Sequence, residues 1–266
     1  MNFYYFSKMD SEVKDFLNES NLLKEDSYYS SAVNNMINNR INSYVNYVNF
    51  KIVYEYFHKY NNLKILDLGC GSGDKCIFLK KFFPSFEIFG IETLNYDDPD
   101  HIEHKPYLFF KKVHEKIKQR FDIKFDFYNG LDLDVKDGFF DVILLYAVIE
   151  HISPEKRTDF INGISKKLKK DGYFVITRCP RNLGIMEFLS RRFNLGAHEW
   201  TLKKNELLGL FSKEKYAVEV FKRMNNVPNN YKFTKNIFYP LVIMDMILDF
   251  LRWPFSTDYF LIVRKK

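Results

Sequence analysis

The run Ile65-Leu-Asp-Leu-Gly-Cys-Gly-Ser-Gly73 decides the fold of this 266-residue chain. Its first half is apolar enough for a buried strand, and a run with helical character begins near Lys75. Between them, glycines at alternate positions let the backbone turn sharply and approach a ligand with no Cβ in the way. The start of the helix adds free N–H groups and a positive dipole end. The run therefore predicts a strand, a ligand-binding turn and a helix, in that order.

Two alternatives to this interpretation are a tight turn that binds nothing and a dinucleotide-binding loop. The dinucleotide loop requires a third small residue at its sixth position, so that helix and strand pack closely around a pyrophosphate. Counted from Gly69, that position is Asp74, whose carboxylate would repel a pyrophosphate. Glu92 directly follows the apolar run Phe89-Gly-Ile91, at the end of the next strand, where an acid can accept from both ribose hydroxyls. The sequence therefore disfavours a dinucleotide and makes Glu92 a candidate ribose-binding residue.

Short β-branched and aromatic runs alternate with helical segments on both sides of this motif. Such alternation requires crossover connections, and it predicts an α/β fold with a mostly parallel sheet and helices on both faces. The seven predicted strands span residues 63–68, 86–91, 123–128, 140–145, 173–178, 217–221 and 259–264.

Two regions lie outside the alternating pattern. Residues 1–60 are predicted to form an N-terminal helical cap, because apolar residues recur every three or four positions between residues 31 and 60. Residues 61–266 then form one domain, with an insertion at about residues 222–257. We expect the stretch 239–253 of this insertion to pack its Leu, Ile and Phe side on the domain. Asp245 and Asp249 are then expected on a wetter face.

Charge, cysteine content and apolar stretches indicate which partners and which cellular location to expect. The formal net charge is +6, but basic and acidic residues alternate along the chain, which argues only weakly for a nucleic-acid partner. The three cysteines, Cys70, Cys76 and Cys179, form no CxxC pair, which favours a reduced, cytoplasmic protein. The first residues lack the basic start and apolar run of a signal peptide. The longest apolar stretch is too short for the roughly 20 residues that a membrane span needs, so we expect no stable membrane insertion.

Three sequence blocks resemble class I S-adenosylmethionine-dependent methyltransferases. The glycine run resembles their motif I, with Glu92 at the position of the ribose-binding acid. Residues 140–152 resemble the fourth strand and the Glu-His pair that follows it, and residues 166–178 are similar to the helix, Gly turn and fifth strand. The order and spacing agree over about residues 60–180. The resemblance implies a Rossmann-like sheet with an antiparallel last strand, S-adenosylmethionine as cofactor and methyl transfer.

The same resemblance implies which residues bind the cofactor. Asp67 would orient the loop and bond near the methionine amino group, the glycines would pass beside the cofactor, and Tyr146 would meet its methionine end. Asn129 stands where many relatives carry an Asp that holds the adenine amino group, and Leu131 is an apolar neighbour for the ring. The implied cofactor-binding set is Asp67, Gly69, Gly71, Gly73, Glu92, Asn129, Leu131 and Tyr146.

Methyl transfer from a sulfonium requires a nucleophile held in line and water excluded. A neutral hydroxyl is a poor nucleophile, so a base is useful for an oxygen acceptor. The candidates are His198, with Glu199 beside it, and His151 after the fourth strand. We predict that His198 is the base and that His151 positions the reactants. The alternatives are a helix-bracing role for His151 and an ordinary surface position for His198.

Residues 178–211 also resemble small-molecule O-methyltransferases of ubiquinone biosynthesis, including the His198-Glu199 pair. Those enzymes place a candidate ligand for a divalent ion three residues before the Glu of the Glu-His pair. This chain has Ala147 there, so we predict no metal.

The methyl acceptor carries no motif of its own. We expect the cap and the insertion to form its pocket. The place where enzymes that methylate flipped bases carry Asn/Asp-Pro-Pro-Tyr reads Tyr146-Ala-Val-Ile, which argues against a nucleic-acid acceptor. The first hypothesis is a small-molecule or glycan-precursor acceptor, methylated on oxygen. The alternatives are an RNA or protein methyltransferase and a non-catalytic partner subunit that binds the cofactor. The oligomeric state is not indicated by the sequence.

Overall fold

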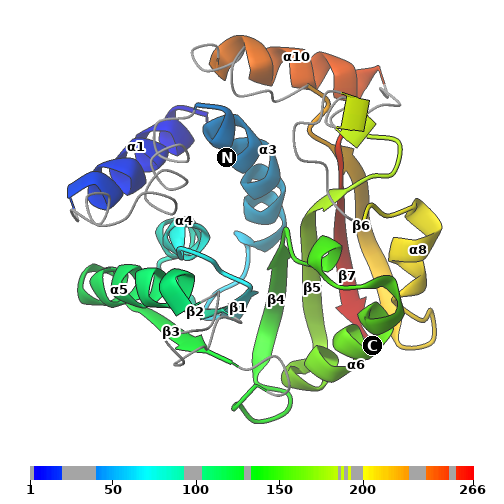
Figure 1. The fold of residues 1–266 in the computed structure, drawn as a ribbon, viewed down its shortest axis with the longest axis horizontal. Helices are drawn as coiled ribbons and strands as arrows, with labels where there is room; N and C mark the ends of the chain where they lie inside the picture. Colours follow the sequence, from blue (N-terminus) through cyan, green and yellow to red (C-terminus); the bar gives the residue numbers. More distant parts are fainter. Residues whose placement is uncertain are drawn as a thin grey trace.

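The central element of the structure is a seven-stranded sheet with the strand order β3-β2-β1-β4-β5-β7-β6 (Figure 1). This computed structural model describes residues 3–19, 40–92, 104–128, 133–184, 187–188, 191–192, 200–227, 238–251 and 256–266. β7 runs antiparallel to both of its neighbours, and the other pairs are parallel, as predicted. The strands are β1 (Lys64–Leu68), β2 (Glu87–Glu92), β3 (Ile123–Phe127), β4 (Phe140–Tyr146), β5 (Leu168–Pro180), β6 (Tyr216–Met224) and β7 (Asp258–Lys265).

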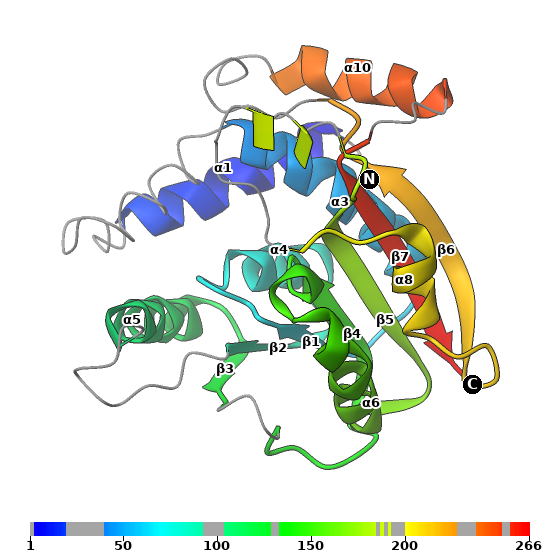
Figure 2. The same cartoon turned by 45° about the vertical axis from the view of Figure 1, so that its right-hand side comes forward.

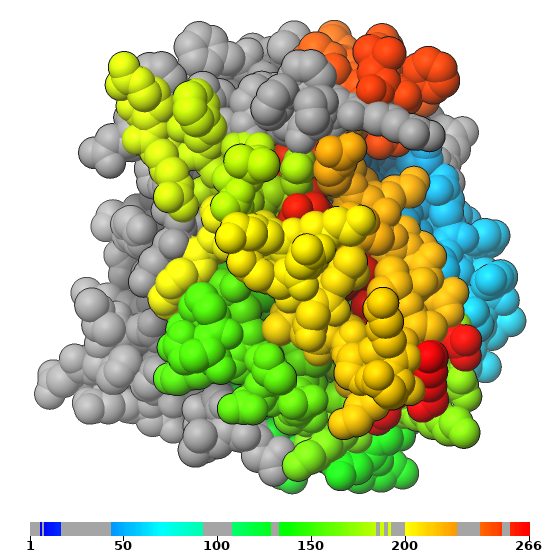
Figure 3. All heavy atoms as spheres, turned by 90° about the vertical axis from the view of Figure 1, so that its right-hand side faces the viewer, coloured from blue at the N-terminus to red at the C-terminus, as the bar shows by residue number. Residues whose placement is uncertain are grey.

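Helices cover both faces of the sheet, which confirms the predicted fold class (Figure 2). Along β4, Val142 and Leu144 join one apolar cluster and Ile143 and Leu145 join the other, because successive side chains of a strand point to opposite faces. The first cluster packs against α1 (Phe3–Glu19), α3 (Arg40–Phe57), α4 (Asp74–Phe82) and α5 (His104–Arg120). The second packs against α6 (Arg157–Lys167) and α8 (Lys204–Gly209), and α8 and β6 form much of the surface in Figure 3.

The described part of the N-terminal cap consists of α1 and α3. Phe6 of α1 stacks on Phe78 of α4 with ring centroids 5.6 Å apart, so α1 packs on the helix that follows the glycine loop. Val53 and Phe57 of α3 belong to the same apolar cluster as β1 and β4. Both cap helices therefore share their core with the sheet.

The helix of the insertion is α10 (Phe238–Phe250). One of its two acids lies on the opposite side from the side that was predicted. Asp249 is exposed as expected, but Asp245 is buried and accepts from the Tyr44 hydroxyl at 2.5 Å and the Asn226 N–H at 2.7 Å. The expectation for Asp245 is wrong because two buried donors offset the cost of removing a carboxylate from water. Apolar side chains face solvent instead, among them Ile243 at 59% and Phe250 at 86% exposure.

The predicted insertion also begins later than expected, because β6 continues to Met224. Within the described segments, no helix combines the length and the apolar character that crossing a membrane would require.

Candidate functional site

The glycine loop joins β1 to α4 at the carboxyl end of the parallel strands. Gly69, Gly71 and Gly73 have φ angles of +78°, +54° and +79°, a region that residues with a Cβ rarely adopt. The N–H of Gly69 donates to the Ile91 carbonyl at 2.7 Å, which attaches the loop to the end of β2. The alternating glycines of the sequence thus correspond to three left-handed backbone positions.

The three glycines have different surroundings. A Cβ on Gly69 would lie 2.9 Å from Val148 Cγ2, and one on Gly73 would lie 2.7 Å from Phe125 Cζ. A Cβ on Gly71 would meet no atom of the described residues within 4 Å. Gly69 and Gly73 are therefore required for close packing, whereas Gly71 borders space that the described residues leave open and that a ligand can occupy.

Glu92 ends β2 and lies beside the loop. Its side chain is buried, and Oε2 accepts the Gly71 N–H at 2.6 Å. The acid identified from its position after the second strand is thus connected directly to the glycine motif.

A pocket of about 1020 Å³ opens over these strand ends. It reaches from Glu92 and Tyr128, past Gly69, to Val148 and the exposed His151 in the segment that follows β4. Ligand pockets span about 300–1,000 Å³, so this one is large enough for a cofactor and a small second molecule. His151 belongs to a short 3₁₀ helix, Ile149–His151, on the pocket wall.

Asp67 lies beneath the glycine loop and is fully buried. Its Oδ2 accepts from the Cys76 thiol at 3.4 Å, while Oδ1 has no hydrogen-bond partner among the described residues. Burial raises the pKa of this carboxyl to about 7. An incompletely bonded carboxylate beside an open glycine loop fits a cationic amino group, and a neighbouring positive charge would lower its pKa again.

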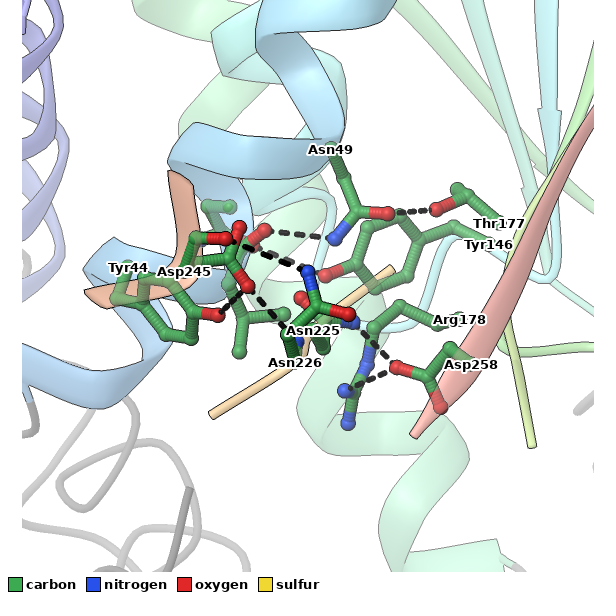
Figure 4. Close-up of polar contacts among 11 residues, drawn as sticks. Tyr44, Asn49, Tyr146, Thr177, Arg178, Asn225, Asn226, Asp245 and Asp258 are labelled. Carbon is green, nitrogen blue, oxygen red and sulfur yellow. Dashed lines mark hydrogen bonds and ion pairs between the residues drawn. The ribbon is translucent and has the colours of Figure 1, made fainter. Parts of the chain in front are cut away.

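Tyr146 ends β4 and points toward α3. Its hydroxyl donates to Asn46 Oδ1 at 3.1 Å, and Lys75 Nζ lies 5.1 Å from the centre of its ring. On the neighbouring strand, the Thr177 hydroxyl donates to Asn49 Oδ1 (Figure 4). The cap helix α3 is therefore hydrogen-bonded to the carboxyl ends of both β4 and β5.

A second polar group lies beside these contacts. Arg178 Nη1 pairs with Asp258 Oδ2 at 2.7 Å, and Asn225 donates to the same carboxylate oxygen (Figure 4). Arg178, Asn225 and Ala147 have φ angles of +59°, +57° and +55°, although none of them is glycine. Strained backbone of this kind concentrates at functional sites.

The structure brings together seven of the residues predicted from the sequence. Asp67, Gly69, Gly71, Gly73, Glu92, Tyr146 and His151 all lie at or near the carboxyl ends of β1, β2 and β4. Asn129, Leu131, His198 and Glu199 lie outside the described residues. Within the described ranges, no group of three or more His, Cys, Asp and Glu side chains is arranged to hold a metal ion.

Sequence reasoning missed the asparagines of α3. Asn46 and Asn49 are spaced by three positions and therefore lie on one side of the helix. Both are buried polar residues in an otherwise apolar helix face, which is the signal that could have identified them.

Comparison with other sequences identifies a matching family and similar individual proteins. A family described as "Methyltransferase domain" matches residues 6–220. A ubiquinone biosynthesis O-methyltransferase from Pelagibacter ubique is 27% identical over 187 residues, which cover 66% of this chain and 71% of that protein. A carboxy-S-adenosyl-L-methionine synthase from Campylobacter hominis is 30% identical over 115 residues, which cover 42% of this chain and only 43% of that relative's length.

Solved structures of similar shape share the same fold. The PH0226 protein from Pyrococcus horikoshii has a TM-score of 0.54 at 16% identity, covering 91% of this chain and 93% of the other. A SAM-dependent methyltransferase from Methanosarcina mazei also has a TM-score of 0.54 at 16% identity, covering 80% of this chain and 96% of the other.

Proposed function

The chain belongs to the class I S-adenosylmethionine-dependent methyltransferases, and we propose that it methylates an oxygen atom of a small metabolite or glycan precursor. The observation that carries the proposal is the pocket of about 1020 Å³, which connects the glycine loop and Glu92 with the wall formed by Val148 and His151. A pocket of this size has room for a small acceptor beside the cofactor.

The described residues are suited to the ribose and to the methionine part of the cofactor. Glu92 would accept from the ribose hydroxyls, Gly71 would let the backbone approach, and Asp67 would hold the amino group of the methionine part. When bound, S-adenosylmethionine supplies an electrophilic methyl group on a sulfonium. Gly69 and Val148 lie close together in the pocket lining, and their apolar contact would help to keep competing water away from the reacting atoms.

The position of α3 supports a small acceptor. Asn46 and Asn49 attach this helix to the ends of β4 and β5, next to the segment in which Ala147 and Val148 line the pocket. A helix fixed across these strand ends restricts the approach of a folded polymer. The similarity to a protein named as an O-methyltransferase of ubiquinone biosynthesis supports oxygen as the target atom.

The acceptor proton must leave as the methyl group arrives. We propose His198 as the base, with Glu199 beside it, and His151 as the residue that positions the reactants. A histidine with an ordinary pKa of about 6.5 can accept a proton near neutral pH. The exposed position of His151 on the pocket wall is consistent with contact to a bound acceptor.

A methyl-transfer assay with labelled cofactor tests the function directly. Fractionated pools of metabolites, glycan precursors, RNA and protein are incubated separately with the enzyme, and the carbon NMR shift of the transferred methyl group distinguishes O-methyl from N-methyl products. Label in the metabolite or glycan-precursor pool, on oxygen, supports the proposal. Label only in RNA or protein contradicts it. Cofactor binding without any label in any pool favours a non-catalytic partner subunit.

A further inference from the structure

His114 of α5 is a buried histidine that the proposed reaction does not use. It is 2% exposed and is not among the residues that line the pocket. Its ring stacks on Phe125 of β3, with centroids 4.1 Å apart, and on Phe127, with centroids 5.3 Å apart. The imidazole is therefore held in one orientation by the aromatic rings around it.

The imidazole makes one short polar contact. Nε2 lies 2.7 Å from the carbonyl oxygen of Gly71, while Nδ1 has no partner among the described residues. Because a carbonyl oxygen can only accept, Nε2 must carry the proton. Burial lowers the pKa of His114 to about 4, so at neutral pH the ring is uncharged and Nδ1 carries none.

The Gly71 residue is thereby held from both sides. Its N–H donates to Glu92 Oε2 at 2.6 Å, and its carbonyl accepts from His114 Nε2 at 2.7 Å. The Cys70 thiol is the other described donor near this carbonyl, but it is a weak donor at 4.0 Å. Gly71 has no Cβ to limit its rotation, so without the imidazole little in the described structure would keep its carbonyl in this orientation.

We propose that His114 is a positioning residue for the cofactor, which holds the Gly71 carbonyl and so keeps the Gly71 N–H on Glu92. The proposal rests on the proposed cofactor site, in which Glu92 binds the ribose. A loop already fixed in its binding conformation loses less conformational freedom when the cofactor binds. His114 is not among the residues that line the pocket, and its effect would pass through the backbone of Gly71.

Two substitutions separate the hydrogen bond from the packing. His114→Phe keeps a flat ring for the stack on Phe125 and removes the donor, whereas His114→Gln keeps an amide N–H near the position of Nε2. His58→Phe is a matched control, because His58 also stacks on a tyrosine and contacts backbone carbonyls, at the exposed end of α3. Affinity for S-adenosylhomocysteine is measured by calorimetric titration at neutral pH, and thermal midpoints are measured on the same samples.

The proposal predicts a specific pattern of affinities and thermal midpoints among these variants. His114→Phe should weaken binding about 3- to 10-fold, as expected for one neutral hydrogen bond. Its thermal midpoint should change little, because the loss of the bond to the Gly71 carbonyl and the removal of the buried, unpartnered Nδ1 act in opposite directions. His114→Gln should bind within about twofold of the wild type, and His58→Phe should bind like the wild type. Wild-type affinity in His114→Phe, or equal weakening in the Phe and Gln variants, would overturn the proposal.

Two further measurements keep the test decisive. If His114→Phe does not fold, nitrogen NMR of the wild-type imidazole still reports the tautomer, and a proton on Nδ1 instead of Nε2 would contradict the proposed bond. Glu92→Ala tests the cofactor site separately. If Glu92→Ala retains wild-type affinity, the site assignment fails. If it loses affinity while His114→Phe does not, only the positioning role of His114 fails.

Discussion

The hydroxyl of Tyr146, the last residue of β4, donates to Asn46 Oδ1 on α3 at 3.1 Å, although the two residues are 100 positions apart. This bond attaches a helix of the N-terminal cap to the strand end at which the methionine part of the cofactor is proposed to lie. Together with the contact between Thr177 and Asn49, it makes α3 a part of the candidate site.

The Tyr146–Asn46 bond can be measured by a double-mutant cycle. Tyr146→Phe leaves Asn46 Oδ1 buried without this donor and should lower the free energy of unfolding by about 1 kcal/mol. The Tyr146→Phe and Asn46→Ala substitutions should be non-additive by about 0.5 kcal/mol or more in urea denaturation. Tyr60→Phe is the control, because it removes a hydroxyl contact to Tyr173 and leaves the bond between Tyr146 and Asn46 in place. It should show no coupling to Asn46→Ala. If the effects of Tyr146→Phe and Asn46→Ala are strictly additive, the bond between these two residues does not stabilise the fold.

Cofactor affinity should depend on Glu92 and Gly71. Glu92→Ala removes charge-assisted hydrogen bonds, each worth about 1.5–3 kcal/mol, so affinity for S-adenosylhomocysteine should fall by at least tenfold. Gly71→Ala places a Cβ where no described residue lies within 4 Å, in space that the cofactor would need, and strains a residue whose φ is +54°. Glu87→Ala, at the exposed start of the same strand, is the control and should bind normally. Unchanged affinity in both site variants would refute the assignment.

The buried carboxylate of α10 should matter for stability, and the exposed one should not. Asp245→Ala leaves the Tyr44 hydroxyl and the Asn226 N–H without their acceptor, and we expect the free energy of unfolding to fall by roughly 2–4 kcal/mol. Asp249→Ala, on the same helix, should change it by less than about 0.5 kcal/mol. Chemical denaturation of the two variants checks this, and equal effects would mean that Asp245 does not anchor α10.

The lowered pKa of His114 predicts a pH effect of known sign. The folded protein holds this ring neutral down to about pH 4, whereas the unfolded chain protonates it below about pH 6.5. Between these values the unfolded state binds more protons, so stability falls as the pH falls, by up to about 3 kcal/mol in total. The groups that face the ring are the Lys118 ammonium, the Cys70 thiol and the rings of Phe110, Phe125 and Phe127.

The measurement compares wild type and His114→Phe at several pH values, because other groups titrate in the same range. Burial raises the pKa of Asp67 to about 7, so its contribution has the opposite sign and destabilises the fold as the pH rises from about 4 to 7. Taking the difference between the two proteins cancels the contribution of Asp67. The difference in unfolding free energy should change by a few kcal/mol between pH 6.5 and pH 4, and a constant difference would show that His114 titrates normally.

His198 should matter for turnover and hardly at all for cofactor binding. His198→Ala removes the proposed base and should lower turnover by about 10²–10⁴-fold, with little change in affinity for S-adenosylhomocysteine. His151→Ala, a change on the pocket wall, should have a smaller effect on turnover and raise the KM of the acceptor. If His198→Ala keeps more than about a third of the wild-type turnover, His198 is not the base.

Local sequence patterns were sufficient to predict the order of the strands along the chain and to bring together the glycine loop and Glu92 of the candidate site. Alternation within a strand and the three-to-four residue spacing within a helix are relations between near neighbours. They can therefore be recognised in the sequence without knowledge of the fold. The first strand was predicted at residues 63–68 and runs from Lys64 to Leu68, and the acid after the second strand, Glu92, does reach the glycine loop. The boundary of β5 was less accurate, because it begins at Leu168 rather than at residue 173.

Contacts between distant polar groups were decided by the tertiary structure alone. The pattern of α10 placed Asp245 toward water, because a carboxylate is costly to bury and its two donors, Tyr44 and Asn226, cannot be recognised from spacing. In the same way, nothing around His114 in the sequence indicates that its ring reaches Gly71, 43 positions earlier. The sequence by itself determined which segments become strands, helices and the glycine turn. Packing determined which buried donors meet which acceptors, because that depends on how distant elements are oriented against each other and not on local periodicity.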